Sequence, residues 1–249
     1  MTTAPLEPAL QQDIARITRI PIIHSIMDVV AQTTGMGFVG VARVTDAAWI
    51  ACAVRDRIGF GLRPGEELPL ESTICNEIRQ HRRPVVIDEV ATDPAFCSHH
   101  TPLRYGFQSY ISFPILRRDG SFFGTLCAID PVPRHLTAPA ITGMFTLFAE
   151  LISFHLGALE DLEQSSRNLE RTATELLAFT HLAAHDLMEP LRKIRFYTDR
   201  ALQSEDETLS ERGRTDLNRV ATAAGGMQGL VRALNQYGGS APEAPPIPV

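Results

Sequence analysis

A histidine followed by an acid, on a stretch with helical periodicity, is the strongest chemical signal in the sequence. Across residues 180–194, apolar residues recur in alternating steps of three and four, which indicates one packed face of a helix. His185 lies one position off that face and Asp186 follows it, so we expect an exposed imidazole beside a carboxylate. Pro190 has no amide hydrogen and is expected to bend the helix one turn later. The apolar positions are Leu177, Ala184, Leu187, Leu191, Ile194 and Ala201.

A neutral imidazole nitrogen is a nucleophile near neutral pH, and a neighbouring carboxylate can orient the ring or take its proton. A single histidine in a helix is more often structural, but here the surrounding residues are specific. The run His-Asp-Leu-Met-Glu-Pro-Leu-Arg, which begins at His185, resembles the H-box of phytochrome-like sensor histidine kinases. The resemblance covers residues 181 to about 237, read as a helical hairpin.

This resemblance implies a role for each matching residue. The histidine that matches His185 attacks the γ-phosphate of ATP and later passes the phosphoryl group to an aspartate of a response regulator. Asp186 would be its acid/base neighbour. Glu189 stands where kinases that also dephosphorylate their regulator often carry Thr or Asn, which argues against that phosphatase activity here.

Composition excludes several classes of protein. The 249 residues are 44% hydrophobic and 21% charged, enough for a real core, and the net charge of -6 argues against a nucleic-acid binder. The four cysteines, Cys52, Cys75, Cys97 and Cys127, show no CxxC or zinc spacing, so we expect reduced thiols in a cytoplasmic protein. An uninterrupted apolar run of the length that a membrane span needs is absent from the sequence, so no span is expected.

The N-terminal half alternates helix and strand patterns. Apolar residues have helical spacing across residues 9–34, and β-rich runs occupy 38–44, 48–54, 84–88, 109–116 and 122–129. This order resembles a GAF domain over residues 22–156, most specifically at 105–115 and 123–130. The resemblance implies a central antiparallel sheet of about six strands, with helices on one face and loops that can enclose a ligand on the other. Residues 1–21 are expected to form a separate N-terminal helical segment.

The C-terminal half is helical. A heptad rhythm continues through residues 157–178, which favours a dimeric signalling coiled coil over a simple surface helix. The hairpin, residues 179–237, has a second apolar seam, and two copies would bury their seams in a dimeric four-helix bundle. Residues 238–249 read as a proline-rich linker. The seam of the second helix consists of Leu217, Val220, Ala224, Met227, Val231 and Leu234.

The irregular stretch 91–105 contains the candidate ligand chemistry of the N-terminal half. Cys97 lies where cyanobacteriochrome-type GAF domains carry a bilin-attaching cysteine, although Ser98 rather than His follows it. An ordinary loop cysteine is the favoured interpretation. A metal site built from Asp93, Cys97, His99 and His100 is not expected, because such close loop residues rarely complete a tetrahedron. The Asn-Lys-Phe-Asp-Glu signature of cyclic-nucleotide GAF domains is absent from the sequence.

Together these patterns predict an α+β protein: a GAF-type sensor, a signalling helix and a phosphoacceptor hairpin, acting as a homodimer with a response regulator receiver domain as partner. The basic residues Arg192, Lys193 and Arg195 could attract the regulator's acidic pocket or form a solvated face. The ATP-binding domain of the kinase family is not found, so phosphorylation would need a catalytic domain supplied otherwise. The alternatives are a non-enzymatic dimeric adaptor and a bilin-binding photoreceptor module.

Overall fold

A computed structural model describes residues 7–203 and 210–239 of the chain. The chain divides into two compact units, residues 1–163 (the first unit) and 164–249 (the second unit). Expectations for residues 1–6, 204–209 and 240–249, which include most of the expected linker and the hairpin turn, lie outside the described residues.

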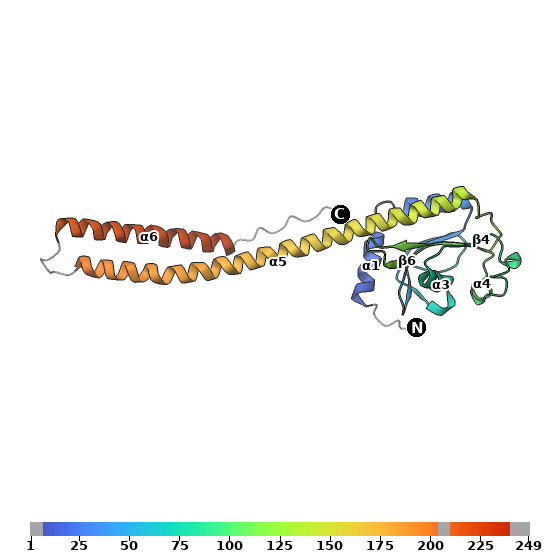
Figure 1. The fold of residues 1–249 in the computed structure, drawn as a ribbon, viewed down its shortest axis with the longest axis horizontal. Coiled ribbons are helices and arrows are strands. Elements are labelled where there is room, and N and C mark those ends of the chain that lie inside the picture. Colours follow the sequence, from blue (N-terminus) through green and yellow to red (C-terminus); the bar gives the residue numbers. More distant parts are fainter. Residues whose placement is uncertain (1–6, 204–209, 240–249) are drawn as a thin grey trace. The chain divides into compact units, whose positions relative to one another are not determined.

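The β-rich runs that the sequence indicates are strands of the first unit, and a short strand at Glu67–Leu68 and a helix at His100–Tyr105 occur where no such element is expected (Figure 1). Its helices are α1 (Pro8–Thr18), α2 (Ile23–Thr34), α3 (Ile74–His81) and α4 (His100–Tyr105), with 3-10 turns at Leu70–Ser72 and Val90–Thr92. Its strands are β1 (Phe38–Val44), β2 (Trp49–Asp56), β3 (Glu67–Leu68), β4 (Val85–Ile87), β5 (Ser109–Leu116) and β6 (Phe122–Asp130). Helix α4 falls in the stretch expected to be irregular, and the His99 side chain caps it by accepting from Thr101 N.

Within the described residues, the strands form one six-stranded sheet in the order β3-β2-β1-β6-β5-β4. Every neighbouring pair is antiparallel. Strands β1 and β6, far apart in sequence, are central neighbours, with Gly40 opposite Cys127. The expected α+β fold with an antiparallel sheet and flanking helices is confirmed.

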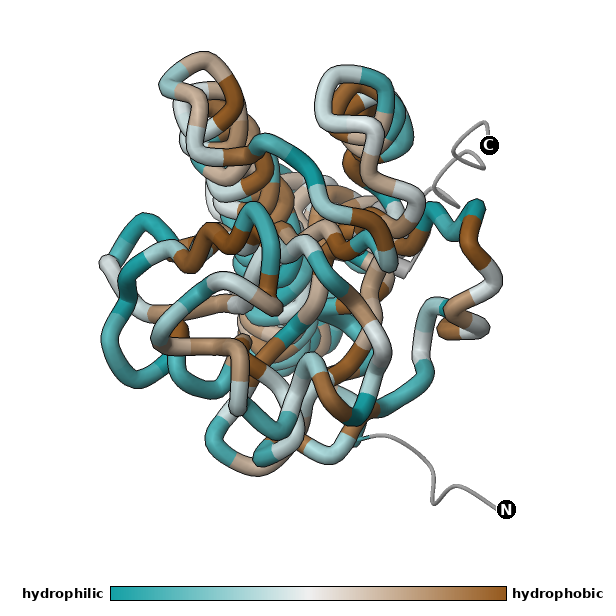
Figure 2. Tube along the Cα trace, turned by 90° about the vertical axis from the view of Figure 1, so that its right-hand side faces the viewer, coloured by the Kyte–Doolittle hydropathy of each residue, from teal (hydrophilic) through white to brown (hydrophobic). Residues whose placement is uncertain are grey.

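Alternating side chains of the sheet bury two separate cores. On one face, Val39, Val41 and Leu126 pack with α1, α2 and the beginning of α5. On the other, Phe38, Tyr110 and Ile129 pack with α3 and the loops near it. Figure 2 shows hydrophilic residues concentrated in the outer loops and hydrophobic ones along the interior segments. Because Ile17 and Ile20 are fully buried in the first core, the N-terminal segment contributes to this fold.

The close approach of β6 to β1 requires a glycine at position 124. A Cβ atom there would lie 1.8 Å from the carbonyl oxygen of Ala42, a backbone atom fixed by the ladder between the two strands. We therefore expect Gly124→Ala to lower the free energy of unfolding by about 3 kcal/mol or more, because the strands must separate. Gly143→Ala in α5 should raise it by up to about 1 kcal/mol, since nothing lies within 4 Å of that Cβ. Urea titration of both variants measures the contrast, and equal effects would contradict this reading.

The C-terminal half consists mainly of two long helices, α5 (Pro139–Gln203) and α6 (Glu211–Gly239). Helix α5 continues through Pro190 without ending, and the bend expected there stays a prediction. In the second unit, Ala184 and Leu191 of α5 pack with Ala224 and Val231 of α6. These are the alternate positions of the two predicted seams. Five of the other seam positions, Leu187, Ile194, Val220, Met227 and Leu234, are 43–57% exposed in the single chain.

The apolar character of α5 bears on the expected absence of a membrane span. Among the described residues, α5 is one helix that is long and apolar enough to cross a membrane by length and composition. Part of it, including Phe145 and Ile152, is fully buried against the sheet of the first unit. A core helix of a soluble protein passes the same test, so this observation is weak evidence for a span.

Candidate functional site

His185 has the exposure and the partner that the sequence predicts. The side chains of His185 and Asp186 are 76% and 70% exposed, and His185 Nδ1 lies 3.2 Å from Asp186 Oδ1. The neighbouring Ala184 and Leu191 are buried against α6, which fixes the face of the helix on which the imidazole projects. The ring is thus held at the surface of the hairpin with its Nδ1 nitrogen engaged.

A groove of about 610 Å³ runs beside His185 between α5 and α6. Arg192 and Arg195 of α5 and Arg232 of α6 line it, together with the carboxylates of Glu189 and Asp199. Arg195 donates to Gln228 Oε1 at 3.4 Å and pairs with Asp199 at 3.7 Å. The groove therefore presents guanidinium groups from both helices along with the imidazole, a setting suited to phosphate or carboxylate oxygens.

Glu189, the residue at the position associated with phosphatase activity, is engaged by another side chain. Its carboxylate lies 2.7 Å from Lys193 Nζ one helical turn later. The hydrogen bond and the charge of Lys193 lower the pKa of Glu189, so it is ionised near neutral pH. A carboxylate paired in this way can accept hydrogen bonds, but it lacks the donor groups of the Thr or Asn side chain.

The second candidate site lies on the face of the sheet opposite α1 and α2. An inner cavity of about 40 Å³ lies among Trp49, Cys75, Thr101, Tyr110 and Cys127. An outer cleft of about 500 Å³ shares six of its lining residues with the inner cavity. These shared residues are Phe60, Leu62, Leu68, Tyr105, Phe107 and Ile129.

Two side chains of the inner cavity have polar atoms with no hydrogen-bond partner among the described residues. They are the indole nitrogen of Trp49 and the hydroxyl of Thr101, in residues that are only 4% and 3% exposed. Buried polar groups are nearly always paired, so unpaired ones at a cavity mark a place for a small polar ligand or water. The outer cleft adds Arg104, whose guanidinium could pair with an acidic group.

Cys97 lies outside the lining of both cavities. It is exposed, and it precedes α4, whose Arg104 and Tyr105 line the outer cleft. The side chains near Cys97 have other partners: His99 pairs with Glu77 at 2.7 Å, and His100 Nε2 lies 2.9 Å from Glu71 O. Asp93 accepts from two backbone amides of the next turn. Within the described residues, no three His, Cys, Asp or Glu side chains come together as a metal site.

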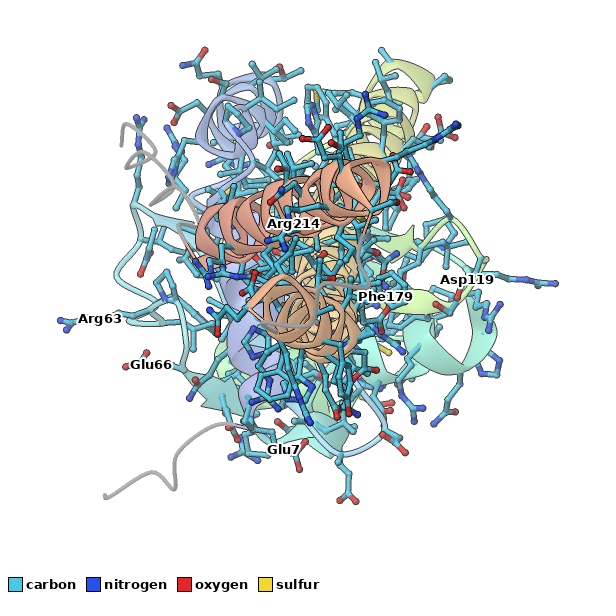
Figure 3. All side chains as sticks on the ribbon, turned by 90° about the vertical axis from the view of Figure 1, so that its left-hand side faces the viewer. Glu7, Arg63, Glu66, Asp119, Phe179 and Arg214 are labelled. Atoms are coloured by element: carbon cyan, nitrogen blue, oxygen red, sulfur yellow. The ribbon has the colours of Figure 1, made fainter. Side chains whose placement is uncertain are left out.

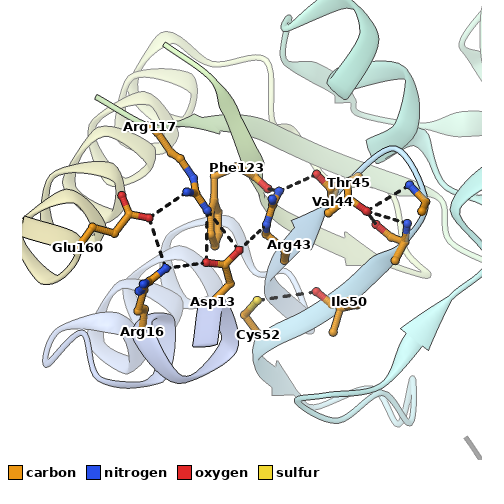
Figure 4. Close-up of polar contacts among 12 residues, drawn as sticks. Asp13, Arg16, Arg43, Val44, Thr45, Ile50, Cys52, Arg117, Phe123 and Glu160 are labelled. Atoms are coloured by element: carbon orange, nitrogen blue, oxygen red, sulfur yellow. Dashed lines mark hydrogen bonds and ion pairs between the residues drawn. The ribbon is translucent and has the colours of Figure 1, made fainter. Parts of the chain in front are cut away.

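An ion cluster joins α1, the sheet and α5 inside the first unit (Figure 4). The carboxylate of Asp13, 7% exposed, lies 3.1 Å from Arg16, 2.7 Å from Arg43 and 3.2 Å from Arg117. Two of these guanidinium groups also pair with carboxylates of α5: Arg16 lies 2.6 Å from Glu163, and Arg117 lies 3.1 Å from Glu160. Arg43 and Arg117 also lie over the Phe123 ring. Sequence reasoning missed this cluster, which ties α5 to the sheet.

The comparisons with known proteins identify relatives of both sequence and fold. The model of the GAF domain family matches residues 18–156, more than half of the chain. The phytochrome-like protein Cph1 of Synechocystis is 30% identical over 97 residues, which are 39% of this chain and 13% of that protein. The cyanobacterial phytochrome B of Nostoc matches with the same identity and coverage. The chain thus spans a small part of these curated relatives.

One solved structure gives the fold comparison. The blue-light absorbing form of the PixJ GAF domain of Thermosynechococcus elongatus superposes with a TM-score of 0.50 at 18% identity. The match covers 68% of this chain and 98% of that chain. At this identity the likeness shows the fold alone.

Proposed function

This chain belongs to the GAF domain family, and on that premise we propose that it passes a signal from its GAF domain to a phosphoryl-accepting histidine, His185. As a GAF sensor module it is related to phytochromes. The observation that carries the proposal is the exposed imidazole, 3.2 Å from the Asp186 carboxylate, beside a groove with arginines from both helices. A cytoplasmic location stays part of the proposal, and its support is the free thiols.

The pairing with Asp186 selects the reacting nitrogen. When Nδ1–H donates to the carboxylate, the lone pair lies on Nε2, which is then the nucleophile. Nε2 attacks the γ-phosphorus of ATP, the bond to the ADP oxygen breaks, and Asp186 stabilises the positive charge that the ring gains. An aspartate of the receiver domain then attacks the phosphorus, the bond from phosphorus to Nε2 breaks, and the imidazole leaves neutral with the proton that it kept on Nδ1. ATP would be held by a catalytic domain supplied outside the described residues.

The arginine groove would serve the same transfer. Arg192, Arg195 and Arg232 line the same groove as the imidazole, and their positive charges suit phosphoryl oxygens and the acidic pocket of a receiver domain. The sequence left two interpretations of the basic residues open, a docking site for the receiver domain or a solvated face. For Arg192 and Arg195, this arrangement supports the docking site. Lys193 pairs with Glu189 instead.

We propose a homodimer because one chain leaves much of its apolar helix surface uncovered. Leu162, Leu169 and Leu176 recur at seven-residue spacing along α5 and are 62–69% exposed. Phe179, labelled in Figure 3, is 69% exposed. Each such side chain contributes about 1.5–3 kcal/mol when buried, so pairing two copies along these rows is strongly favourable. A four-helix bundle made by two hairpins would also cover the half-exposed seam positions.

The proposal is tested by supplying the ATP-binding domain of a histidine kinase with labelled ATP, and then a receiver domain. We expect acid-labile, base-stable phosphate on this chain, and its loss when the receiver is added. A dimer that takes up no label from several kinase domains, yet binds a receiver domain, would instead support the non-enzymatic adaptor.

The relatives favour a second candidate function more directly, a photoreceptor module that carries a bilin. Two relatives are named as phytochromes or phytochrome-like, and the structural neighbour is a light-absorbing GAF domain. In this chain the outer cleft would hold the group, Arg104 would pair with a propionate, and Cys97 would be the attachment thiol. The outer cleft can hold such a group, but Cys97 does not line the cleft and is therefore poorly placed to bond to a bilin in it.

Absorption spectroscopy separates this candidate from an uncoloured sensor. The chain would be produced in cells that synthesise a bilin, purified, and compared with a Cys97→Ala variant. Covalent attachment at Cys97 predicts visible absorption that survives denaturation in the parent and is lost in the variant. A colourless parent protein would exclude the bilin.

A further inference from the structure

Two of the buried cysteines lie together in the inner cavity, and the proposed function does not use them. Cys75 lies in the first turn of α3 and Cys127 on β6, where Thr125, two residues before Cys127 on the same strand, donates to Cys75 Sγ. Both residues line the inner cavity and are at most 5% exposed. No local pattern pairs the two cysteines, because 51 residues of chain separate them.

The surroundings of the pair are polar in an otherwise apolar core. Thr125 Oγ1 donates to Cys75 Sγ at 3.3 Å, and the Tyr110 hydroxyl lies 3.4 Å from the same sulfur. The Cys127 thiol donates to the carbonyl oxygen of Gly40 at 3.5 Å. Thr125 therefore donates to Cys75 and the Tyr110 hydroxyl lies within hydrogen-bond distance of it, whereas the hydrogen of Cys127 is directed to a carbonyl.

This asymmetry divides the roles of the two sulfurs. The neighbouring Cys127 thiol, with Thr125 and Tyr110 contributing further, lowers the pKa of Cys75 despite its burial. The proximity of Cys75, together with burial, raises the pKa of Cys127 well above its usual value. One sulfur is thus ready as a thiolate nucleophile and the other retains its proton, the pattern of a reactive dithiol.

We propose that Cys75 and Cys127 are a redox-active pair that converts a small hydroperoxide into an intramolecular disulfide in the GAF pocket. The cavity of about 40 Å³ exceeds the space that one water-sized molecule needs, and Trp49 and Thr101 offer unpaired polar atoms to an oxygen there. The outer cleft shares walls with the cavity and is the route by which the oxidant enters.

The reaction balances with the hydroperoxide as the sole oxidant. The Cys75 thiolate attacks one peroxide oxygen, the O–O bond breaks, and the departing alkoxide takes a proton to become an alcohol, or water from hydrogen peroxide. Cys75 is then a sulfenic acid. The Cys127 sulfur attacks the Cys75 sulfur, the S–O bond breaks, and the hydroxide leaves as water with the Cys127 proton. Two thiols and one peroxide thereby become a disulfide, an alcohol and water.

Forming this bond would alter the pocket. The two sulfurs must approach to the roughly 2.05 Å of a disulfide, which draws the beginning of α3 toward β6. Helix α3 is one wall of the inner cavity, through Ile74 and Cys75. Oxidation would therefore reshape the ligand site, giving the GAF domain a chemical input separate from ligand binding.

The test uses the full chain with the exposed Cys97 changed to Ser, which prevents disulfides between molecules. The reduced protein is treated with hydrogen peroxide, denatured, alkylated and digested for mass spectrometry. We expect a peptide pair joined through Cys75 and Cys127, with Cys52 fully alkylated. Cys52 is the internal control, because burial on the opposite face raises its pKa to about 12. Alkylation of both Cys75 and Cys127 after peroxide has been consumed would overturn the proposal.

Two further measurements assign the order of attack. In Cys127→Ser, dimedone should trap a sulfenic acid on Cys75, whereas trapping on Cys127 in Cys75→Ser would overturn the assignment. In the parent, the lowered pKa of Cys75 predicts a rate that reaches its plateau below the pH at which ordinary thiols ionise. A rate that still climbs through the pH of about 8.5, where ordinary thiols ionise, would contradict a thiolate stabilised by this cluster.

Discussion

A chain with glutamine in place of His185 is expected to take up no phosphate above background from labelled ATP and a supplied kinase domain. Glutamine fits the helix, but its amide nitrogen has no available lone pair for attack on phosphorus. Because His185 is 76% exposed, its replacement should change the free energy of unfolding by less than about 0.5 kcal/mol. The measurement is acid-labile phosphate per chain, followed over time.

The control for this variant lies one helical turn earlier on the same helix. His181 is also exposed, so His181→Gln should keep the labelling of the parent chain. Asp186→Asn should be labelled about 100-fold more slowly, because the amide cannot stabilise the charged ring. Loss of labelling in His181→Gln with full labelling in His185→Gln would show that the acceptor has been assigned to the wrong residue.

Replacing Asp13 with asparagine is expected to lower the free energy of unfolding by roughly 3–5 kcal/mol. The substitution keeps the shape of the side chain but leaves Arg16, Arg43 and Arg117 around a neutral amide in a nearly buried position. The remaining carboxylates, on Glu160 and Glu163, lie on the far side of the guanidinium groups. Urea titration with an unchanged slope would isolate the change in stability.

The matched control is an ion pair at the surface of the same unit. Asp161 pairs with Arg118, and both side chains are more than half exposed. Water screens that pair, so Asp161→Asn should alter the free energy of unfolding by at most about 0.5 kcal/mol. If Asp13→Asn were as mild as Asp161→Asn, the cluster would not tie α5 to the sheet.

Local periodicity was sufficient to predict the features that depend on neighbouring residues. The alternation across residues 109–116 predicted the strand that is β5, and the helical spacing around His185 predicted its exposure. In both cases the residues that face the core recur at fixed intervals, every two residues in a strand and every 3.6 residues in a helix.

Features that depend on distant residues could not be predicted in this way. Arg16 on α1 and Glu163 on α5 are 147 positions apart in the sequence. They meet because both helices pack on the same face of the sheet. Arg232 reaches the groove of His185 from the second helix, whereas the sequence indicated basic residues on the first helix alone. The cysteines were read as ordinary reduced thiols, because nothing local distinguishes Cys75 and Cys127 from Cys52.

The proposed relay depends on two chains joining their helices around accessible imidazoles. The most direct measurement is therefore the mass of the intact chain in solution, by light scattering over a range of concentrations. We expect twice the 27.4 kDa of one chain, and the single-chain mass for a variant with Leu169→Lys and Leu176→Lys. A folded parent chain with a mass of 27.4 kDa at every concentration would contradict the account.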